Sequence, residues 1–123
     1  MMSEARKRIA VTGGHGKIGK TLEPYIREHG YEVFVIDRDG PLDPEEAMMK
    51  ADLEDFGETL DALSSTGKGT YARAELGPFD AVVHLASIPH PRMIRDAAEF
   101  HTNMMATYNV FEAARRLGIK NVV

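Results

Sequence analysis

Three glycines that follow a short apolar segment are the strongest chemical signal in this sequence of 123 residues. Gly14, Gly16 and Gly19 have the spacing G-x-G-x-x-G, and Asp37 follows at roughly the 20-residue distance of a dinucleotide-binding fingerprint. Glycines there permit a tight turn and let the backbone approach a pyrophosphate, while the next helix offers free N–H groups to the phosphates. Asp37 can accept hydrogen bonds from ribose hydroxyls. The pattern predicts a dinucleotide-binding turn.

The same turn also matches a second phosphate-binding pattern. Residues 14–21, GHGKIGKT, fit G-x-x-x-x-G-K-[ST], the phosphate loop of nucleoside triphosphatases. In that case Lys20 would reach the β- and γ-phosphates and Thr21 would hold magnesium, as in a P-loop ATPase or kinase. Residues 14–21 alone leave both interpretations open.

Composition limits the class of protein. With 43% hydrophobic and 28% charged residues, the chain is typical of one globular domain. A net charge of −4 provides no broad attraction for nucleic acid or an anionic membrane, and no apolar run approaches the roughly 20 residues of a membrane span. The absence of cysteine excludes disulfides and thiolate metal sites, and the histidines have no metal-ligand spacing. We therefore expect a cytoplasmic protein without a metal, a nucleic-acid partner or a membrane partner.

The pattern of apolar segments and turn residues predicts alternating strands and helices. Strands are expected at 9–11, 32–37, 48–50, 81–86 and 119–123, and helices at 17–29, 55–63 and 97–117. Polar loops are expected at 38–47, 64–78 and 87–96. This order predicts an α/β fold with a doubly wound, Rossmann-like parallel sheet, in which the chain stops within the fifth strand. A ligand should bind at the carboxyl ends of the strands, where strand order reverses between the first and the fourth.

Each helix is expected to bury one face, read from apolar spacings of three and four. Pro24 lies within the first helix, where it loses the bond to the Lys20 carbonyl, so we expect a kink or a weakly bonded turn on the solvent side. The inward faces are predicted to be Ile18, Leu22, Tyr25 and Ile26 in the first helix, Phe56, Leu60 and Leu63 in the second, and Phe100, Met104, Thr107, Phe111 and Ala114 in the third.

Four separated patterns resemble one known family. They are the turn TGGHGKIG at 12–19, the pair Asp52-Leu53, the segment HLAS at 84–87, and the spacing N-x-x-x-T-x-N-x-x-E-A-A from Asn103. These resemble the TGGxGxIG turn, the Asp-Leu pair beside adenine, the HLAA strand end and the cofactor-side helix of the extended short-chain dehydrogenase/reductases, the NAD-dependent epimerase/dehydratase family. The patterns cover nearly the whole chain in the family's order, and so favour this interpretation over the phosphate loop.

The resemblance implies the NAD-binding portion of an epimerase, dehydratase or dehydrogenase that acts on a sugar or nucleotide sugar by hydride transfer. NAD is expected rather than NADP, because the carboxylate of Asp37 would repel a 2′-phosphate. The expected cofactor-binding residues are Gly13, Gly16, Lys17, Ile18, Gly19, Asp37, Arg38, Asp52, Leu53, Leu85, Ala86, Ser87 and Asn103.

Several of these residues also have a purely structural interpretation. Asp37 can serve only as a turn residue, and Asp52 can cap the helix that follows it. Arg38 can stack on adenine, meet a 2′-phosphate or point into water, and Asn103 can be an ordinary polar position on a helix. For His84, on a buried strand, a hydrogen-bonded core histidine is favoured over a catalytic base.

One departure from the family pattern concerns catalysis. The family's Tyr-x-x-x-Lys pair lies beyond the fifth strand, and no tyrosine of this sequence is followed by lysine four positions later. We therefore expect residues 1–123 to be the N-terminal part of a dinucleotide-binding domain, with no catalytic residue, from an enzyme that forms homo-oligomers. A non-catalytic dinucleotide-binding module is the alternative.

Overall fold

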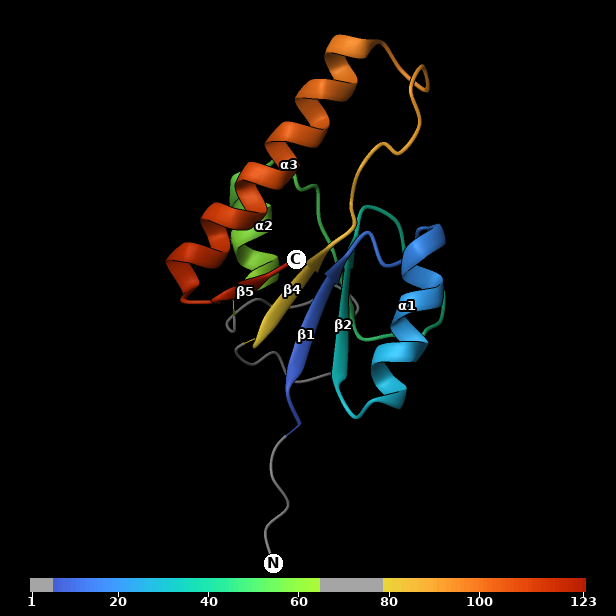
Figure 1. Ribbon diagram of the computed structural model, residues 1–123, viewed down its shortest axis with the longest axis vertical. Coiled ribbons are helices and arrows are strands. Elements are labelled where there is room, and N and C mark those ends of the chain that lie inside the picture. Colours follow the sequence, from blue (N-terminus) through green and yellow to red (C-terminus); the bar gives the residue numbers. More distant parts are fainter. Residues whose placement is uncertain (1–5, 65–78) are drawn as a thin grey trace, which may run out of the picture.

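The computed structural model describes residues 6–64 and 79–123. Within these residues, parallel strands form one sheet in the order β3-β2-β1-β4-β5 (Figure 1). The strands are β1 Arg8–Thr12, β2 Glu32–Asp37, β3 Met48–Lys50, β4 Ala81–His84 and β5 Asn121–Val122, and the helices are α1 Lys17–Glu28, α2 Phe56–Leu63 and α3 Asp96–Leu117. The predicted doubly wound sheet is confirmed, with its order reversing between β1 and β4. The loop predicted at 64–78 lies outside the described residues beyond Ser64.

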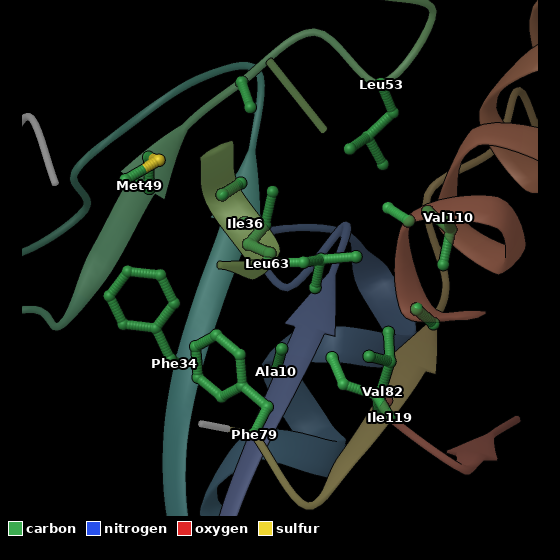
Figure 2. Packing of buried hydrophobic residues seen from close by; sticks show 14 of the residues in the cluster. Ala10, Phe34, Ile36, Met49, Leu53, Leu63, Phe79, Val82, Val110 and Ile119 are labelled. Atoms are coloured by element: carbon green, nitrogen blue, oxygen red, sulfur yellow. The ribbon is translucent and has the colours of Figure 1, made fainter. Parts of the chain in front are cut away.

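The sheet is covered on both faces, which explains the near-continuous apolar runs of its strands. Along β1, Ala10 packs in the cluster with α2 and α3, whereas Val11 packs in the cluster with α1. Along β2, Phe34 and Ile36 share the side of Ala10, and alternate residues turn to α1. Figure 1 shows α1 on one side of the sheet and α2 with α3 on the other, and Figure 2 shows the larger cluster.

The strand predicted at 81–86 is shorter than expected, because β4 ends at His84. The next two residues leave the sheet and bond to the end of β1. The N–H groups of Leu85 and Ala86 donate to Thr12 Oγ1 at 3.1 and 3.2 Å. This bond pattern turns the chain away from β4 and brings residues 85–87 to the carboxyl edge of the sheet.

The predicted inward face of α1 is correct for Leu22 and Ile26 and wrong for two residues. Ile18 is 67% exposed, because the first helical turn lies at the carboxyl edge of the sheet rather than over it. The Tyr25 ring is also exposed and packs on the His29 ring, with 4.3 Å between centroids. Pro24 lies on the exposed side, and α1 continues past it to Glu28.

The helix α2 begins one residue later than predicted because Asp55 is its N-cap. The Asp55 carboxylate accepts a hydrogen bond from the N–H of Glu58 at 2.9 Å. Leu63 is buried as predicted, Phe56 and Leu60 are half-buried at the edge of the core, and the small side chains of Thr59 and Ala62 fill the contact instead.

The predicted inward face of α3 is wrong except at Ala114. The buried residues are small or of moderate size, namely Ala106, Asn109, Val110, Ala113 and Ala114. Such residues allow α3 to approach the sheet and α2 closely, and the large side chains therefore occupy the opposite face. This exposed stripe, called the α3 stripe below, consists of Phe100, Met104, Tyr108 and Phe111, and Phe100 is 68% exposed.

Candidate functional site

A cleft of about 340 Å³ lies at the carboxyl edge of the sheet, at the point where strand order reverses. Its volume falls within the range of small-molecule sites. In Figure 1 the start of α1 and the N-terminal half of α3 both lie at this edge. The structure brings all of the sequence-predicted site residues into the lining: Gly13, Gly16, Lys17, Ile18, Gly19, Asp37, Arg38, Asp52, Leu53, Leu85, Ala86, Ser87 and Asn103.

The glycines of the turn must lack a side chain for different structural reasons. Gly13 has a φ of +67°, and a Cβ there would lie 2.7 Å from the backbone nitrogen of Ala86. A Cβ on Gly19 would lie 2.6 Å from the Cα of Gly14, so both positions must be bare for the turn, α1 and the 85–87 segment to pack. A Cβ on Gly16 would meet only the Gly13 carbonyl oxygen, at 3.1 Å, and Gly16 lines the cleft. The absent side chain of Gly16 therefore leaves space for a ligand.

The N-terminus of α1 has the properties of an anion site. Gly16 is the N-cap, no side chain caps it, and the first helical turn contains no acid. The N–H groups of Lys17, Ile18 and Gly19 have no partner within the helix, and all three residues line the cleft. The positive end of the helix dipole is thus open to a phosphate.

This helix start argues against the phosphate-loop interpretation. In a P-loop the glycine-rich segment stays open as far as the lysine, so that the lysine reaches the terminal phosphates. Here α1 already begins at Lys17, and Gly19 is buried in its first turn. Among the described residues, the cleft lining includes Lys17 but neither Lys20 nor Thr21.

Asp37 is held in one orientation by backbone donors from two segments. Its Oδ2 accepts from the N–H of His15 at 3.1 Å. Its Oδ1 accepts from the N–H groups of Arg38 at 2.7 Å and Asp39 at 3.3 Å. Each carboxylate oxygen has two lone pairs, so acceptor capacity remains for a ligand. The turn role considered for Asp37 is therefore present, and it also orients the carboxylate in the cleft.

The Asp52-Leu53 pair is held by Asn109, which belongs to the helix pattern noted in the sequence, and by Thr59, which sequence reasoning missed. Asp55, and not Asp52, caps α2, while Asp52 Oδ1 accepts from the N–H of Glu54 at 3.0 Å. The carbonyl oxygen of Leu53 accepts from Asn109 Nδ2 at 2.8 Å and from Thr59 Oγ1 at 3.3 Å. Asn109 and Thr59 are both buried. Thr59 lies on the predicted inward face of α2, and a polar residue at such a position is the signal that could have identified it. Asn109 lies opposite the predicted inward face of α3, so helical periodicity gave no such signal for it.

His84 is half-buried and hydrogen-bonded through both ring nitrogens, so the structural role favoured from the sequence is present, although the residue is not part of the core. Thr12 Oγ1 accepts from two N–H groups, so its own hydrogen is directed to His84 Nδ1, 2.7 Å away. His84 Nε2–H then donates to Thr107 Oγ1 at 3.1 Å. Burial lowers the pKa of His84, which agrees with this neutral tautomer. The chain of bonds joins β1, β4 and α3 beneath the cleft.

Asn103 lines the cleft and also holds the loop after β4. Its Oδ1 accepts from the N–H of Ile88 at 2.8 Å, and its Nδ2 donates to the Ile88 carbonyl at 3.2 Å. On the same helix, Thr102 Oγ1 donates to Glu54 Oε1 at 3.2 Å. These bonds connect α3 to the two loops on either side of it, so that α3 forms one wall of the cleft.

Within residues 6–64 and 79–123, no group of three or more His, Cys, Asp or Glu side chains is arranged to hold a metal ion. No helix in these two segments is both long enough and apolar enough to cross a membrane.

Comparison with known proteins shows the family that this chain resembles in sequence and fold. The family model "NAD dependent epimerase/dehydratase family" matches residues 9–123. A dTDP-glucose 4,6-dehydratase of Mycobacterium tuberculosis is 34% identical over 122 residues, covering 92% of this chain and 34% of the relative. The corresponding protein of Neisseria gonorrhoeae is 32% identical over 125 residues, covering 94% and 34%. A crystal structure of Thermus thermophilus UDP-glucose 4-epimerase in complex with NAD has a TM-score of 0.74 and 25% identity, covering 94% of this chain and 36% of that one.

The chain therefore spans about a third of the length of the curated relatives that it matches. The residues matched by the family model, 9–123, contain β2 to β5, all of β1 except Arg8, and the cleft-lining residues described above.

Proposed function

The chain belongs to the NAD-dependent epimerase/dehydratase family, and from this membership we propose that it provides the dinucleotide site of an enzyme that acts on a sugar or nucleotide sugar. The reaction is hydride transfer between a hydroxyl-bearing carbon and the nicotinamide ring that the bound cofactor supplies. One observation carries the proposal. The glycine turn, Asp37 and the 85–87 segment, which are distant in sequence, line a single cleft at the topological switch point.

The residues of the cleft fit a dinucleotide in kind and in order. The uncapped start of α1 offers N–H donors and a lysine to the pyrophosphate, and Gly16 leaves room for it. Asp37 provides an oriented acceptor for the hydroxyls of the adenosine ribose. Leu53, held by Asn109, forms an apolar wall for adenine beside Asp52 and Arg38.

The 85–87 segment is the proposed nicotinamide side of the site. Leu85, Ala86 and Ser87 line the cleft on the side of α3. Ser87 is exposed and does not pack in the core. Asn103 contributes by holding Ile88 through both polar atoms of its amide, and so by setting the path of this segment. In this proposal Asn103 positions the site and the three loop residues contact the ligand.

NAD is proposed as the cofactor in preference to NADP. A carboxylate at position 37, fixed by three backbone N–H groups, would repel a 2′-phosphate while accepting bonds from free ribose hydroxyls. The T. thermophilus epimerase, which has a similar fold, is a complex with NAD. Hydrogen bonds to a charged group contribute about 1.5–3 kcal/mol, which corresponds to roughly tenfold or more in affinity.

Titration calorimetry with NAD⁺, NADP⁺ and Mg-ATP tests this assignment. We expect NAD⁺ to bind most tightly, and Asp37→Ala to weaken NAD⁺ by about tenfold while reducing the discrimination against NADP⁺. Lys20→Ala is the matched control, because Lys20 is outside the cleft lining and this variant should keep its NAD⁺ affinity. Binding of Mg-ATP that is lost in Lys20→Ala, with no NAD⁺ signal, would overturn the proposal in favour of a phosphate loop.

A homo-oligomer formed through the α3 stripe completes the proposal. Phe100, Met104, Tyr108 and Phe111 form one exposed apolar face, which is unusual for a surface that faces only water. The first turn of α3 carries Asp96 and Glu99 and its last turn carries Arg115 and Arg116, so two antiparallel copies would bring opposite charges together. A second copy of the chain is therefore the proposed partner of this face.

A further inference from the structure

A buried contact between two polar side chains links the glycine turn to the loop at 38–47. His15 Nε2 lies 2.6 Å from Glu46 Oε1, and the two side chains are only 7% and 8% exposed. His15 occupies a variable position of the turn patterns, Glu46 lies outside them, and the pair was not anticipated from the sequence. Glu46 also accepts from the N–H of Leu42 through its other oxygen, at 3.0 Å. The pair therefore connects residue 15 to both the middle and the end of this loop.

The same histidine takes part in holding Asp37. Its backbone N–H donates to Asp37 Oδ2, while the loop provides the N–H groups of Arg38 and Asp39 to Oδ1. The contacts thus form a closed ring that runs from Asp37 to His15, then to Glu46, and back along the loop to Asp37. Every donor to the Asp37 carboxylate belongs either to residue 15 or to the loop that residue 15 holds.

Packing alone does not account for a histidine at this position. The ring packs closely under the loop, since a Cβ on Gly40 would lie 2.7 Å from His15 Cε1. Yet Nδ1 of the ring is buried and has no hydrogen-bond partner among residues 6–64 and 79–123. A buried polar atom without a partner is unfavourable, and an apolar ring of similar shape would avoid it. The polar contact through Nε2 is therefore the feature of His15 that an apolar side chain of similar shape could not provide.

We propose that the His15–Glu46 pair is a positioning device that sets the preference for NAD over NADP. By holding the 38–47 loop against the glycine turn, it keeps the Asp37 carboxylate directed at the ribose and the Arg38-Asp39 backbone close to it. Without the pair the loop is released, the carboxylate turns away, and Arg38 gains the freedom to meet a 2′-phosphate. His15 and Glu46 act through Asp37 rather than by touching the reacting atoms. This inference rests on the proposed NAD site.

The test uses His15→Phe, Glu46→Leu and the double variant on the 123-residue chain. Calorimetry measures the Kd values for NAD⁺ and NADP⁺, and thermal unfolding is recorded for each protein. We expect the ratio of the NADP⁺ Kd to the NAD⁺ Kd to fall at least fivefold, or about 1 kcal/mol, in each single variant. The double variant should fall no further, because residues that act as one unit are non-additive.

Stability separates positioning from simple loss of structure. The double variant replaces both polar partners with apolar groups, so it should unfold at a temperature close to that of the unmodified chain while its cofactor preference remains lost. His90→Phe, a histidine-to-phenylalanine change on an exposed loop outside the cleft lining, is the matched control and should preserve the ratio.

The possible failures are distinguishable. If the unmodified chain binds NAD⁺ tenfold better than NADP⁺ and the double variant is folded with the same ratio, the positioning role is wrong and the proposed function stands. If the unmodified chain binds neither dinucleotide, the proposed function is wrong, and this inference is wrong with it. Additive losses in the double variant would show that His15 and Glu46 act separately, which also contradicts the proposal. If a single variant fails to fold, the ratio of the two Kd values in the double variant decides whether the positioning role is correct.

Discussion

At the scale of single residues, the glycines of the turn divide into those required by the protein and one required by a ligand. Spacing alone predicted the turn, because the need for a bare backbone is a local property. Spacing could not show which contact each glycine protects. Gly13 is constrained by Ala86, a residue more than 70 positions away in sequence, whereas Gly16 faces the cleft. That difference depends on the path of the chain after β4.

Paired substitutions distinguish these two roles. Gly16→Val should abolish NAD⁺ binding and leave the circular dichroism spectrum and the unfolding temperature nearly unchanged, because its side chain would enter only the cleft. Gly13→Ala should instead destabilise the protein, by about 1–3 kcal/mol, since its Cβ would collide with backbone and its φ is positive. Retained NAD⁺ binding in Gly16→Val would place the phosphates elsewhere.

His84 gives the protein a pH dependence of known sign. Burial lowers its pKa from 6.5 in the folded state, so the unfolded chain binds a proton more readily there. Stability from this residue is complete above about pH 6.5 and decreases as the pH falls through that value toward the lower folded pKa. Urea unfolding between pH 7.5 and about pH 5 should show a steeper loss for the natural chain than for His84→Gln. Parallel pH profiles would contradict the buried neutral histidine.

At the scale of elements, strands were predicted more accurately than helix faces. The bounds of β2 and β3 match the prediction because a strand buried on both sides reads as one apolar run. For α3, periodicity selected its large apolar residues, but the helix buries alanines and Asn109 and exposes Phe100 and Phe111. Periodicity reports that a helix has an apolar face, and it cannot tell a face buried in the core from one left for a partner.

Among the residues that join one element to another, Asn109 is the one whose substitution should be most informative. Its amide donates to the Leu53 carbonyl within the core and so joins α3 to the loop beneath the cleft. Asn109→Leu leaves that carbonyl with only the longer bond from Thr59, and we expect the free energy of unfolding to fall by about 1–3 kcal/mol. Asn121→Leu is the matched control, because Asn121 is exposed and its amide makes only an exposed bond of 3.3 Å to the Asp80 carbonyl oxygen, and the expected change is within about 0.5 kcal/mol. Equal effects in urea unfolding would show that the Asn109 bond contributes nothing specific.

At the scale of the whole molecule, the sequence predicted the order of the strands and the location of the cleft. Both follow from the alternation of strands and helices, since right-handed crossovers leave few ways to arrange them. The sequence did not predict the His15–Glu46 pair or the link between Asn103 and Ile88. Each joins residues whose neighbourhood is created only when separate loops meet at one edge of the sheet. The residue types were visible in the sequence, but their partners were not.

The last prediction concerns the surfaces through which the chain associates. The β4–β5 edge of the sheet is one candidate, because backbone groups at a sheet edge can pair with a strand of another chain. The structure adds the α3 stripe as a second candidate, with four large apolar side chains on one helix face. Burial of apolar area is the main favourable term in association, so we now expect the stripe to dominate.

Light scattering on the purified 123 residues should report a dimer or a larger species that binds NAD⁺ but shows no turnover with a nucleotide sugar, because the sequence holds no Tyr-x-x-x-Lys pair. Met104→Glu combined with Phe111→Glu should shift the chain to a monomer with NAD⁺ affinity intact, since neither residue lines the cleft. Val123→Lys, which places a charge at the end of β5 on a side chain that is 83% exposed, is the matched control and should leave the dimer unchanged. If Val123→Lys yields the monomer and the α3 variant does not, the sheet edge is the true interface and the charge pattern of α3 has another purpose.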